Sequence, residues 1–528
     1  MTMQALPVRG ALTLRPGGDI WHKPALSVVI TLAIPEVALL LAGRLDLVFY
    51  VAAGGLCSLY AHGLPYAARA RTLVWVVLGM LVSTGIALTT AALTDSTAVR
   101  VAVAALLASV HKAVCDATRI GPPANVIFTF VAAGAAFLPQ QLADVPAHLA
   151  LGVLGGAIAW LVCMAPALVR PHGPERIAVA RALEAAARLL RADRSAADTA
   201  RRPRHDVAAT ANAAWHTLRL ARPGDHLTGL EHLLVRAESA AAAPEAYADQ
   251  ADRLTGWACE LRKGRTLPDP GYSAAAETAE LAGLGAERRP ASGLRTVLRA
   301  FAPGSPLLPI AGRVALGGAL AGWTSMALGV DRPYWAVVTA AAVFQANTTL
   351  SWHRALQRAL GNLLGVLLFT ALVPLISTGQ AALVAVALAC QFSAEATIAR
   401  NYWLGTVFVT PMAMIMVQFA GPQPVGQLIT DRWLDTLVGV VAGLLACYLV
   451  PNRRAKGRVD TALARLDGAV EAGSRDRLAA ALLELREAAD TASGEWWSAA
   501  LPEERIAAAE RQGHRVLAAL TSPSGRVR

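Results

Sequence analysis

Charged residues are scarce in this chain: Asp, Glu, Lys and Arg make up 16% of it, against roughly 25% in soluble domains. Apolar residues make up 55%. Several apolar runs approach the roughly 20 residues that a helix needs to cross a bilayer. The composition therefore excludes an ordinary soluble protein and predicts an all-α polytopic membrane protein.

Cysteine is scarce too. Six cysteines are scattered over 528 residues, and no CxxC pair occurs, so we expect neither a metal site nor a disulfide framework. Enzyme motifs are also missing, because the chain has no GxxxxGK[ST] phosphate loop, no HExxH and no nucleophile elbow. We expect a protein that is not an enzyme and that uses no cofactor.

The formal net charge is +11. A basic chain could bind nucleic acid, but here the basic residues concentrate beside apolar runs, where membrane orientation explains them. We therefore expect no nucleic-acid partner, and membrane lipid as the surroundings of the chain.

The apolar runs form two blocks of six, at residues 24–169 and 306–450. The expected spans are 24–41, 47–62, 72–93, 98–114, 125–138, 147–169, 307–328, 334–346, 356–375, 381–396, 402–420 and 433–450. Between the blocks, residues 170–305 read as a cytoplasmic helical domain with 3.6-residue periodicity, and residues 451–528 as a cytoplasmic helical tail. Residues 1–23 read as a cytoplasmic leader without a cleavage site.

Loop charges set the orientation. The loops 139–146, 377–380 and 421–430 contain no Lys or Arg, so they are expected outside, with both termini in the cytoplasm. The exceptions at the outer side are Arg44, Arg100, Arg332 and Arg432. We expect a multi-pass protein of the plasma membrane.

The two blocks resemble each other. Each has a tyrosine, a short apolar run, a polar elbow, an arginine pair and a long apolar run, which predicts two parallel six-helix repeats. Coincidence in a sequence rich in Ala, Leu and Gly is the alternative. The two cytoplasmic helical pieces could pack together or across a homo-oligomer interface.

Residues 331–365 are the stretch around which the chain is organised. Arg354, Arg358 and Asn362 recur every fourth residue, so they share one helix face. Gly361 and Gly365 form a GxxxG step that lets a neighbouring helix come close. Guanidinium groups at a membrane helix are costly unless they face protein, water or an anion. The three polar residues are therefore candidates for binding a carboxylate, although both arginines could instead snorkel to the cytoplasmic surface.

The polar elbow before this helix spans residues 345–351. Gln345 and Asn347 are further candidate ligands there. Thr348, Thr349 or Ser351 is expected to cap the helix by accepting one of its free N–H groups.

An aromatic group opens the preceding short run. Arg332, Tyr334 and Trp335 fit an interfacial aromatic belt. They could equally guard an exit for planar anions, because Arg stacks on rings and pairs with carboxylates.

Carboxyl groups in the spans are candidates for coupling or gating. Glu36 lies inside the first span and could carry a proton, or could pair with a basic group such as Arg100. Glu395 and Arg400 could form a simple ion pair at the inner surface or part of a gate.

The chain resembles the fusaric-acid-resistance-like family of aromatic acid exporters. The resemblance rests on Tyr334–Trp335–Ala336 followed by Arg358, Gly361 and Gly365, in the pattern YWA…RxxGxxxG. It implies a plasma-membrane exporter of small, often aromatic, organic anions, with the proton gradient as a driving force. The family is related to plant malate channels, so an anion channel is one alternative. A membrane scaffold or sensor that transports nothing is the other.

Overall fold

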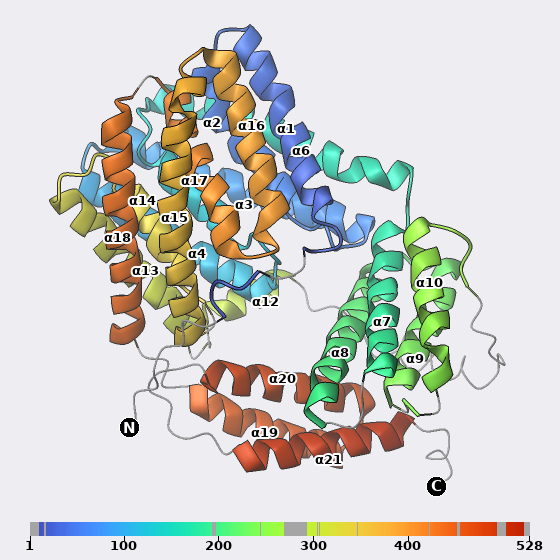
Figure 1. Cartoon of the computed structure of the whole chain (residues 1–528). Coiled ribbons are helices and arrows are strands. Elements are labelled where there is room, and N and C mark those ends of the chain that lie inside the picture. Colours follow the sequence, from blue (N-terminus) through green and yellow to red (C-terminus); the bar gives the residue numbers. More distant parts are fainter. Residues whose placement is uncertain are drawn as a thin grey trace. The chain divides into compact units, whose positions relative to one another are not determined.

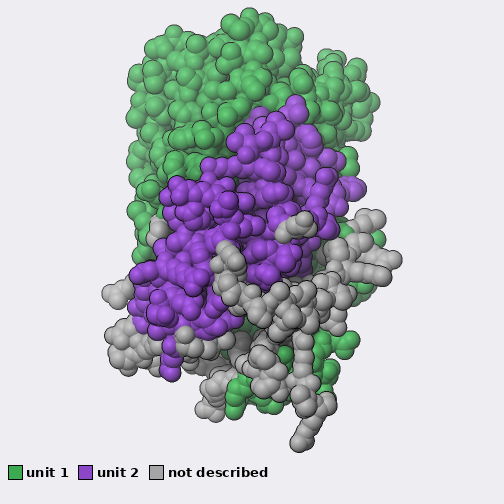
Figure 2. Space-filling view, turned by 90° about the vertical axis from the view of Figure 1, so that its right-hand side faces the viewer, with its two compact units in different colours: residues 1–60, 76–159, 291–528 green, residues 61–75, 160–290 purple. Residues whose placement is uncertain are grey.

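The computed structural model describes residues 10–14, 17–192, 197–242, 244–245, 247–268, 293–303, 305, 307–345, 347–421, 423–450, 455–493 and 503–521. Within these ranges the chain is helical and contains no strand. It forms two compact units, which Figure 2 shows in different colours. One comprises residues 1–60, 76–159 and 291–528, and the other residues 61–75 and 160–290.

Each expected span overlaps a helix, and Figure 1 labels most of these helices. The helices of the first block are α1 (His22–Leu41), α2 (Val48–Gly55), α3 (Tyr66–Leu93), α4 (Thr97–Thr118), α5 (Asn125–Ala135) and α6 (Val145–Met164). Those of the second are α13 (Leu308–Ala327), α14 (Tyr334–Val343), α15 (Thr348–Ile376), α16 (Gln380–Ile398), α17 (Tyr402–Phe419) and α18 (Val425–Leu449). The short helix α12 (Gly293–Ala300) precedes the second block.

Not every one of these helices can cross a bilayer alone. Among the described residues, eight are long and apolar enough: α1, α3, α4, α6, α15, α16, α17 and α18. Three shorter apolar helical stretches lie at Leu45–Leu59, Asn125–Ala135 and Tyr334–Val343. The helix α13 has 20 residues but is less apolar. Eight of the twelve expected spans thus meet this length and hydropathy among the described residues, and the number of helices that cross the membrane stays a prediction.

The two blocks interlock through corresponding pairs of helices. The first helix of each block packs on the fourth helix of the other, as α1 on α16 and α13 on α4. The second helix of each block likewise contacts the fifth of the other, as α2 with α17 and α14 with α5. These paired contacts support the two-repeat organisation, which stays a prediction.

Glycines allow close packing at the matching place in each block. An added Cβ at Gly155 of α6 would collide with the carbonyl oxygen of Val51 in α2. An added Cβ at Gly439 of α18 would lie 2.7 Å from the carbonyl oxygen of Ala336 in α14. Both short second helices are thus held against the sixth helix of their own block, with little room for larger side chains.

Four amphipathic helices dominate the second unit: α7 (Gly173–Arg191), α8 (Ala197–Leu220), α9 (Asp225–Ala242) and α10 (Ala251–Lys263). Leu183, Leu230 and Leu254 are fully buried in their shared core. An ion pair of 2.6 Å between Arg262 and Glu184 joins α10 to α7. These helices lie within the expected helical domain 170–305.

The tail forms three more helices, α19 (Ala455–Glu471), α20 (Arg475–Ser493) and α21 (Glu503–Thr521). Leu463, Leu485 and Ile506, one from each helix, are buried in a common apolar core. The amphipathic pattern of this segment is thus explained by the packing of the tail helices on one another.

Candidate functional site

The elbow before α15 is held by its own polar groups. Asn347 caps the helix, because its side chain accepts the N–H three residues later at 2.9 Å. The expected caps Thr348, Thr349 and Ser351 are wrong. Ser351 Oγ instead accepts the N–H of Gln345 and donates to the carbonyl oxygen of Asn347, each at 2.9 Å. The side chain of Gln345 donates to the carbonyl oxygen of Phe344 at 2.9 Å, so the side chains of both Gln345 and Asn347 bond to the backbone of the elbow.

The two arginines of α15 meet Tyr402, the first residue of α17. Arg358 is 3% exposed, and its Nη1 donates to the Tyr402 hydroxyl at 2.9 Å. The guanidinium carbon of Arg354 lies 3.8 Å from the centre of the Tyr402 ring, in a cation–π contact. The snorkelling alternative is therefore wrong for Arg358, whose side chain points into protein.

Asn362 continues this polar face deeper into the bundle. It is 2% exposed, and its Nδ2 donates to Thr436 Oγ1 at 2.8 Å. Its Oδ1 accepts from Thr410 Oγ1 at 2.7 Å and from Arg432 Nη2 at 3.5 Å. The amide thus joins α15 to α17 and α18.

A third arginine, Arg432 of α18, completes the cluster. It is 2% exposed, and its guanidinium carbon lies 5.0 Å from the centre of the Trp335 ring in α14. Asp435, three residues later and fully buried, accepts a short hydrogen bond from Ser325 of α13. We call Arg358, Asn362, Arg432 and Asp435 the buried arginine cluster.

The cluster holds more positive than negative charge. Arg358 and Arg432 are both buried, whereas Asp435 is the one fully buried carboxyl group among the described parts of α13 to α18. No salt bridge joins Asp435 to either arginine in the described residues, and the Nε atoms of both arginines lack hydrogen-bond partners. Buried charge without a partner is strongly destabilising, so the arrangement favours an additional negative group.

The glycines of the GxxxG step permit this geometry. An added Cβ at Gly361 would lie 2.6 Å from Thr406 Cβ and from the carbonyl oxygen of Trp403. At Gly365 it would lie 2.6 Å from Thr410 Cβ. Both glycines therefore let α17 come close enough to α15 for Asn362 and Thr410 to bond.

The aromatic opening of α14 is less exposed than an interfacial belt would be. Trp335 is fully buried, and Tyr334 is 8% exposed with its ring 5.5 Å from that of Phe137. Arg332 donates to Gln423 Oε1 at 2.8 Å and lies 3.6 Å from the carboxylate of Asp431. Trp335 thus contacts the buried arginine cluster through Arg432, while the carboxylate of Asp431 is the counter-charge of Arg332.

The coupling candidates lie apart from this network. Glu36 is buried in α1, and its Oε2 has no hydrogen-bond partner. Arg100 bonds to the carbonyl oxygens of Thr94 and Ala91 and not to Glu36. Among the residues that the structure describes, no salt bridge links Glu395 to Arg400, which is exposed. The simple ion pair considered for them is wrong.

An N-terminal segment crosses the ends of α15 and α17. The carbonyl oxygen of Ala11 accepts from Gln357 Nε2 at 2.6 Å and from Asn401 Nδ2 at 3.0 Å. Trp403 Nε1 donates to the carbonyl oxygen of Leu12 at 3.3 Å. The segment thus ties together the two helix ends that carry Arg354 and Tyr402.

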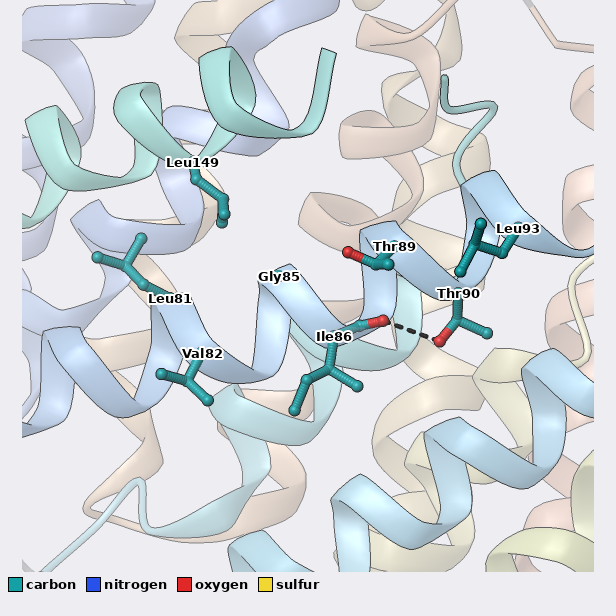
Figure 3. Close-up of a pocket in the computed structure, with 8 residues that line it drawn as sticks. All are labelled: Leu81, Val82, Gly85, Ile86, Thr89, Thr90, Leu93 and Leu149. Carbon is teal, nitrogen blue, oxygen red and sulfur yellow. Dashed lines mark hydrogen bonds between the residues drawn. The ribbon is translucent and has the colours of Figure 1, made fainter. Parts of the chain in front are cut away.

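A separate groove lies between α3 and α6 (Figure 3). It has a volume of about 610 Å³. Its lining residues are Leu81, Val82, Gly85, Ile86, Thr89, Thr90, Leu93 and Leu149. The hydroxyl of Thr90 is bonded to the carbonyl oxygen of Ile86 at 2.8 Å. Because no charged group lines the groove, it offers no site for an anion.

Sequence reasoning missed half of the cluster. The sequence places Arg432 at the outer side, ahead of an apolar run that begins at Trp433, whereas α18 begins at Val425. Asp435 lies inside that expected span, and an acid in an apolar run was a usable signal. Nothing in the sequence pairs Tyr402 with Arg358.

Residues 320–446 match the family described as fusaric acid resistance protein-like. An uncharacterized membrane protein of Bacillus subtilis (strain 168), YvaC, is 26% identical over 482 residues, which is 84% of this chain and 75% of that protein. No solved structure matches the chain. The match covers the whole buried arginine cluster and confirms the resemblance expected from the sequence. The protein is therefore a membrane protein whose residues 320–446 match the fusaric acid resistance protein-like family.

Proposed function

We propose that the protein exports small organic carboxylates, aromatic ones above all, across the plasma membrane. The observation that carries the proposal is the charge of the buried arginine cluster. Two guanidinium groups are buried in the second block, with one carboxyl group, Asp435, in the same cluster. An arriving carboxylate brings a negative charge beside the guanidinium groups and can accept paired hydrogen bonds from one of them.

The cluster has donors to spare for such a ligand. The Nε atoms of Arg358 and Arg432 are buried and unbonded. The positive charge of Arg358 also acts on Arg432, so an anion between them relieves their mutual repulsion. The ring of Trp335, 5.0 Å from the guanidinium carbon of Arg432, places an aromatic side chain beside the proposed position of the acid.

The family match supports transport of this kind, because the matched family is named for resistance to an aromatic acid. Arg354, at the opening of α15, is proposed to attract the anion, and Arg358 and Asn362 to receive it. An anion channel uses the same residues, and a scaffold uses none of them.

Flux into liposomes that contain the purified protein tests the proposal. The anions are benzoate, 4-hydroxybenzoate, terephthalate and malate, with protein-free liposomes as the measure of passive leak. We expect saturable, protein-dependent flux of the aromatic acids, which Arg358→Ala abolishes.

The matched control is Arg44→Ala, which removes an exposed arginine whose partner is Asp46. It should keep wild-type flux. Equal flux with Arg358→Ala, or none with the wild-type protein, would overturn the proposal. Flux of malate without saturation would favour the channel.

A further inference from the structure

Asp435 has an unsatisfied oxygen in the interior of the membrane block. The residue is fully buried, and its Oδ1 accepts from the hydroxyl of Ser325. Its Oδ2 is shielded from solvent and has no hydrogen-bond partner. An ionised carboxyl group is costly in such a place. The cost falls when the group takes up a proton or when a cation comes to it.

Among the charged groups around Asp435, one cation can stabilise its ionised form. Arg432 lies three residues earlier on the same helix and interacts with it electrostatically. The other charged or titratable groups that act on Asp435 or on Arg432 are Asp431 of α18, Arg332 ahead of α14, Tyr334 of α14, Arg358 of α15 and Tyr402 of α17. From α13 comes the hydroxyl of Ser325. Because Arg332 pairs with Asp431 at 3.6 Å, Arg432 is the cation available to Asp435.

We infer that Asp435 takes up a proton when a carboxylate binds beside Arg432, so that anion and proton enter the site together. The inference rests on the proposed function. In the empty site, two guanidinium groups and one ionised Asp435 give a net charge of +1. With a monocarboxylate bound and Asp435 protonated, two guanidinium groups and the anion again give +1. The bound anion thereby replaces Asp435 as the counter-charge of Arg432, and a protonated Asp435 no longer needs a cation beside its unbonded Oδ2.

Exchange of the anion for a proton is disfavoured by the net charge of the site. Suppose instead that the anion and the proton replaced each other. With the anion bound and Asp435 ionised, the site would hold two positive and two negative charges. With Asp435 protonated and no anion, it would hold two positive charges alone. The net charge would then change between 0 and +2 in a buried environment, where uncompensated charge is most costly. The geometry therefore favours movement of proton and anion in the same direction.

Transport of a monocarboxylate with one proton carries no net charge. Export then follows the gradient of the acid itself, and an acidic cytoplasm favours it. A proton gradient directed into the cell opposes it, so on this inference the proton gradient is not the driving force that the family resemblance implies.

Binding of benzoate to the full-length purified protein between pH 6 and 8 tests the inference. Benzoate stays ionised over this range, so a pH effect reports on the protein. We expect the wild-type affinity to rise as pH falls, by up to tenfold per pH unit where Asp435 exchanges its proton. Proton uptake on binding is measured in weakly buffered solution. In Asp435→Asn, which keeps the size of the side chain and its bond from Ser325, both effects should vanish.

Asp46→Asn is the control, because it alters an exposed carboxylate, and it should show the wild-type pH dependence. Should Asp435→Asn fail to fold, Ser325→Ala serves instead. Loss of its hydrogen bond makes an ionised Asp435 less stable, so the pH at which affinity changes should rise by about half to one unit.

The outcomes separate the two proposals. No benzoate binding by the wild-type protein at any pH overturns the proposed function and the inference with it. Binding that is independent of pH, weaker at low pH, or unchanged in its pH dependence by Asp435→Asn or Ser325→Ala overturns the inference alone.

Discussion

At the scale of single residues, the buried guanidinium groups determine what the protein can bind. Arg358 donates to a neutral phenol and Arg432 to a neutral amide. Neither partner neutralises charge, so a carboxylate ligand gains both attraction and hydrogen bonds on entering. The spacing of Arg354, Arg358 and Asn362 was enough to predict one polar helix face. Their partners Tyr402 and Thr410 could not be predicted, because the folded chain alone brings these residues together.

Replacement of Arg358 by Lys should preserve the charge but not the paired hydrogen bonds. Lys presents a compact ammonium group in place of the planar fork of Arg. We expect Arg358→Lys to transport benzoate with an apparent affinity about tenfold weaker, which corresponds to about 1.4 kcal/mol. Initial rates of flux over a range of concentrations measure it. Wild-type affinity in this variant would show that paired hydrogen bonding does not matter.

At the scale of helices, the contact between α15 and α17 positions the cluster. The sequence predicted the GxxxG step and the break between a short α14 and a long α15. It did not predict the start of α18, because Asp431, Arg432 and Asp435 interrupt the hydropathy of that helix. Polar residues buried by tertiary contacts make a helix seem shorter than it is.

Gly361→Ala should weaken the α15–α17 contact. The new Cβ would meet Thr406 and the backbone of Trp403 at 2.6 Å, and such overpacking typically costs about 1–3 kcal/mol. We expect a lower melting temperature in detergent. Gly312→Ala is the control, because no heavy atom lies within 4 Å of its added Cβ and Ala favours a helix by about 1 kcal/mol. Equal melting temperatures for the two variants would refute the role of Gly361.

At the scale of the whole molecule, two apolar blocks precede and follow an amphipathic helical domain in the sequence. Apolar runs and 3.6-residue periodicity were sufficient to predict this order. They could not distinguish a full span from a short buried helix such as α14, because both are apolar throughout. Packing alone shows that α14 is enclosed by neighbouring helices.

Cys259 provides a test of the orientation. It is the exposed cysteine in α10, whereas the other five cysteines are buried. If residues 170–305 are cytoplasmic, a membrane-impermeant maleimide should label Cys259 after the cells are permeabilised and not before. Cys259→Ser gives the background. Labelling in intact cells would place this domain outside and reverse the topology.

The central claim is that the buried arginine cluster binds a carboxylate, and titration calorimetry with benzoate measures this most directly. The wild-type protein and Arg44→Ala should bind benzoate alike. Arg358→Ala and Arg432→Ala should each weaken binding by about 1.5–3 kcal/mol, or more than tenfold, since each removes a charged hydrogen-bond donor. Undiminished binding by both cluster variants, with normal folding, would contradict the account.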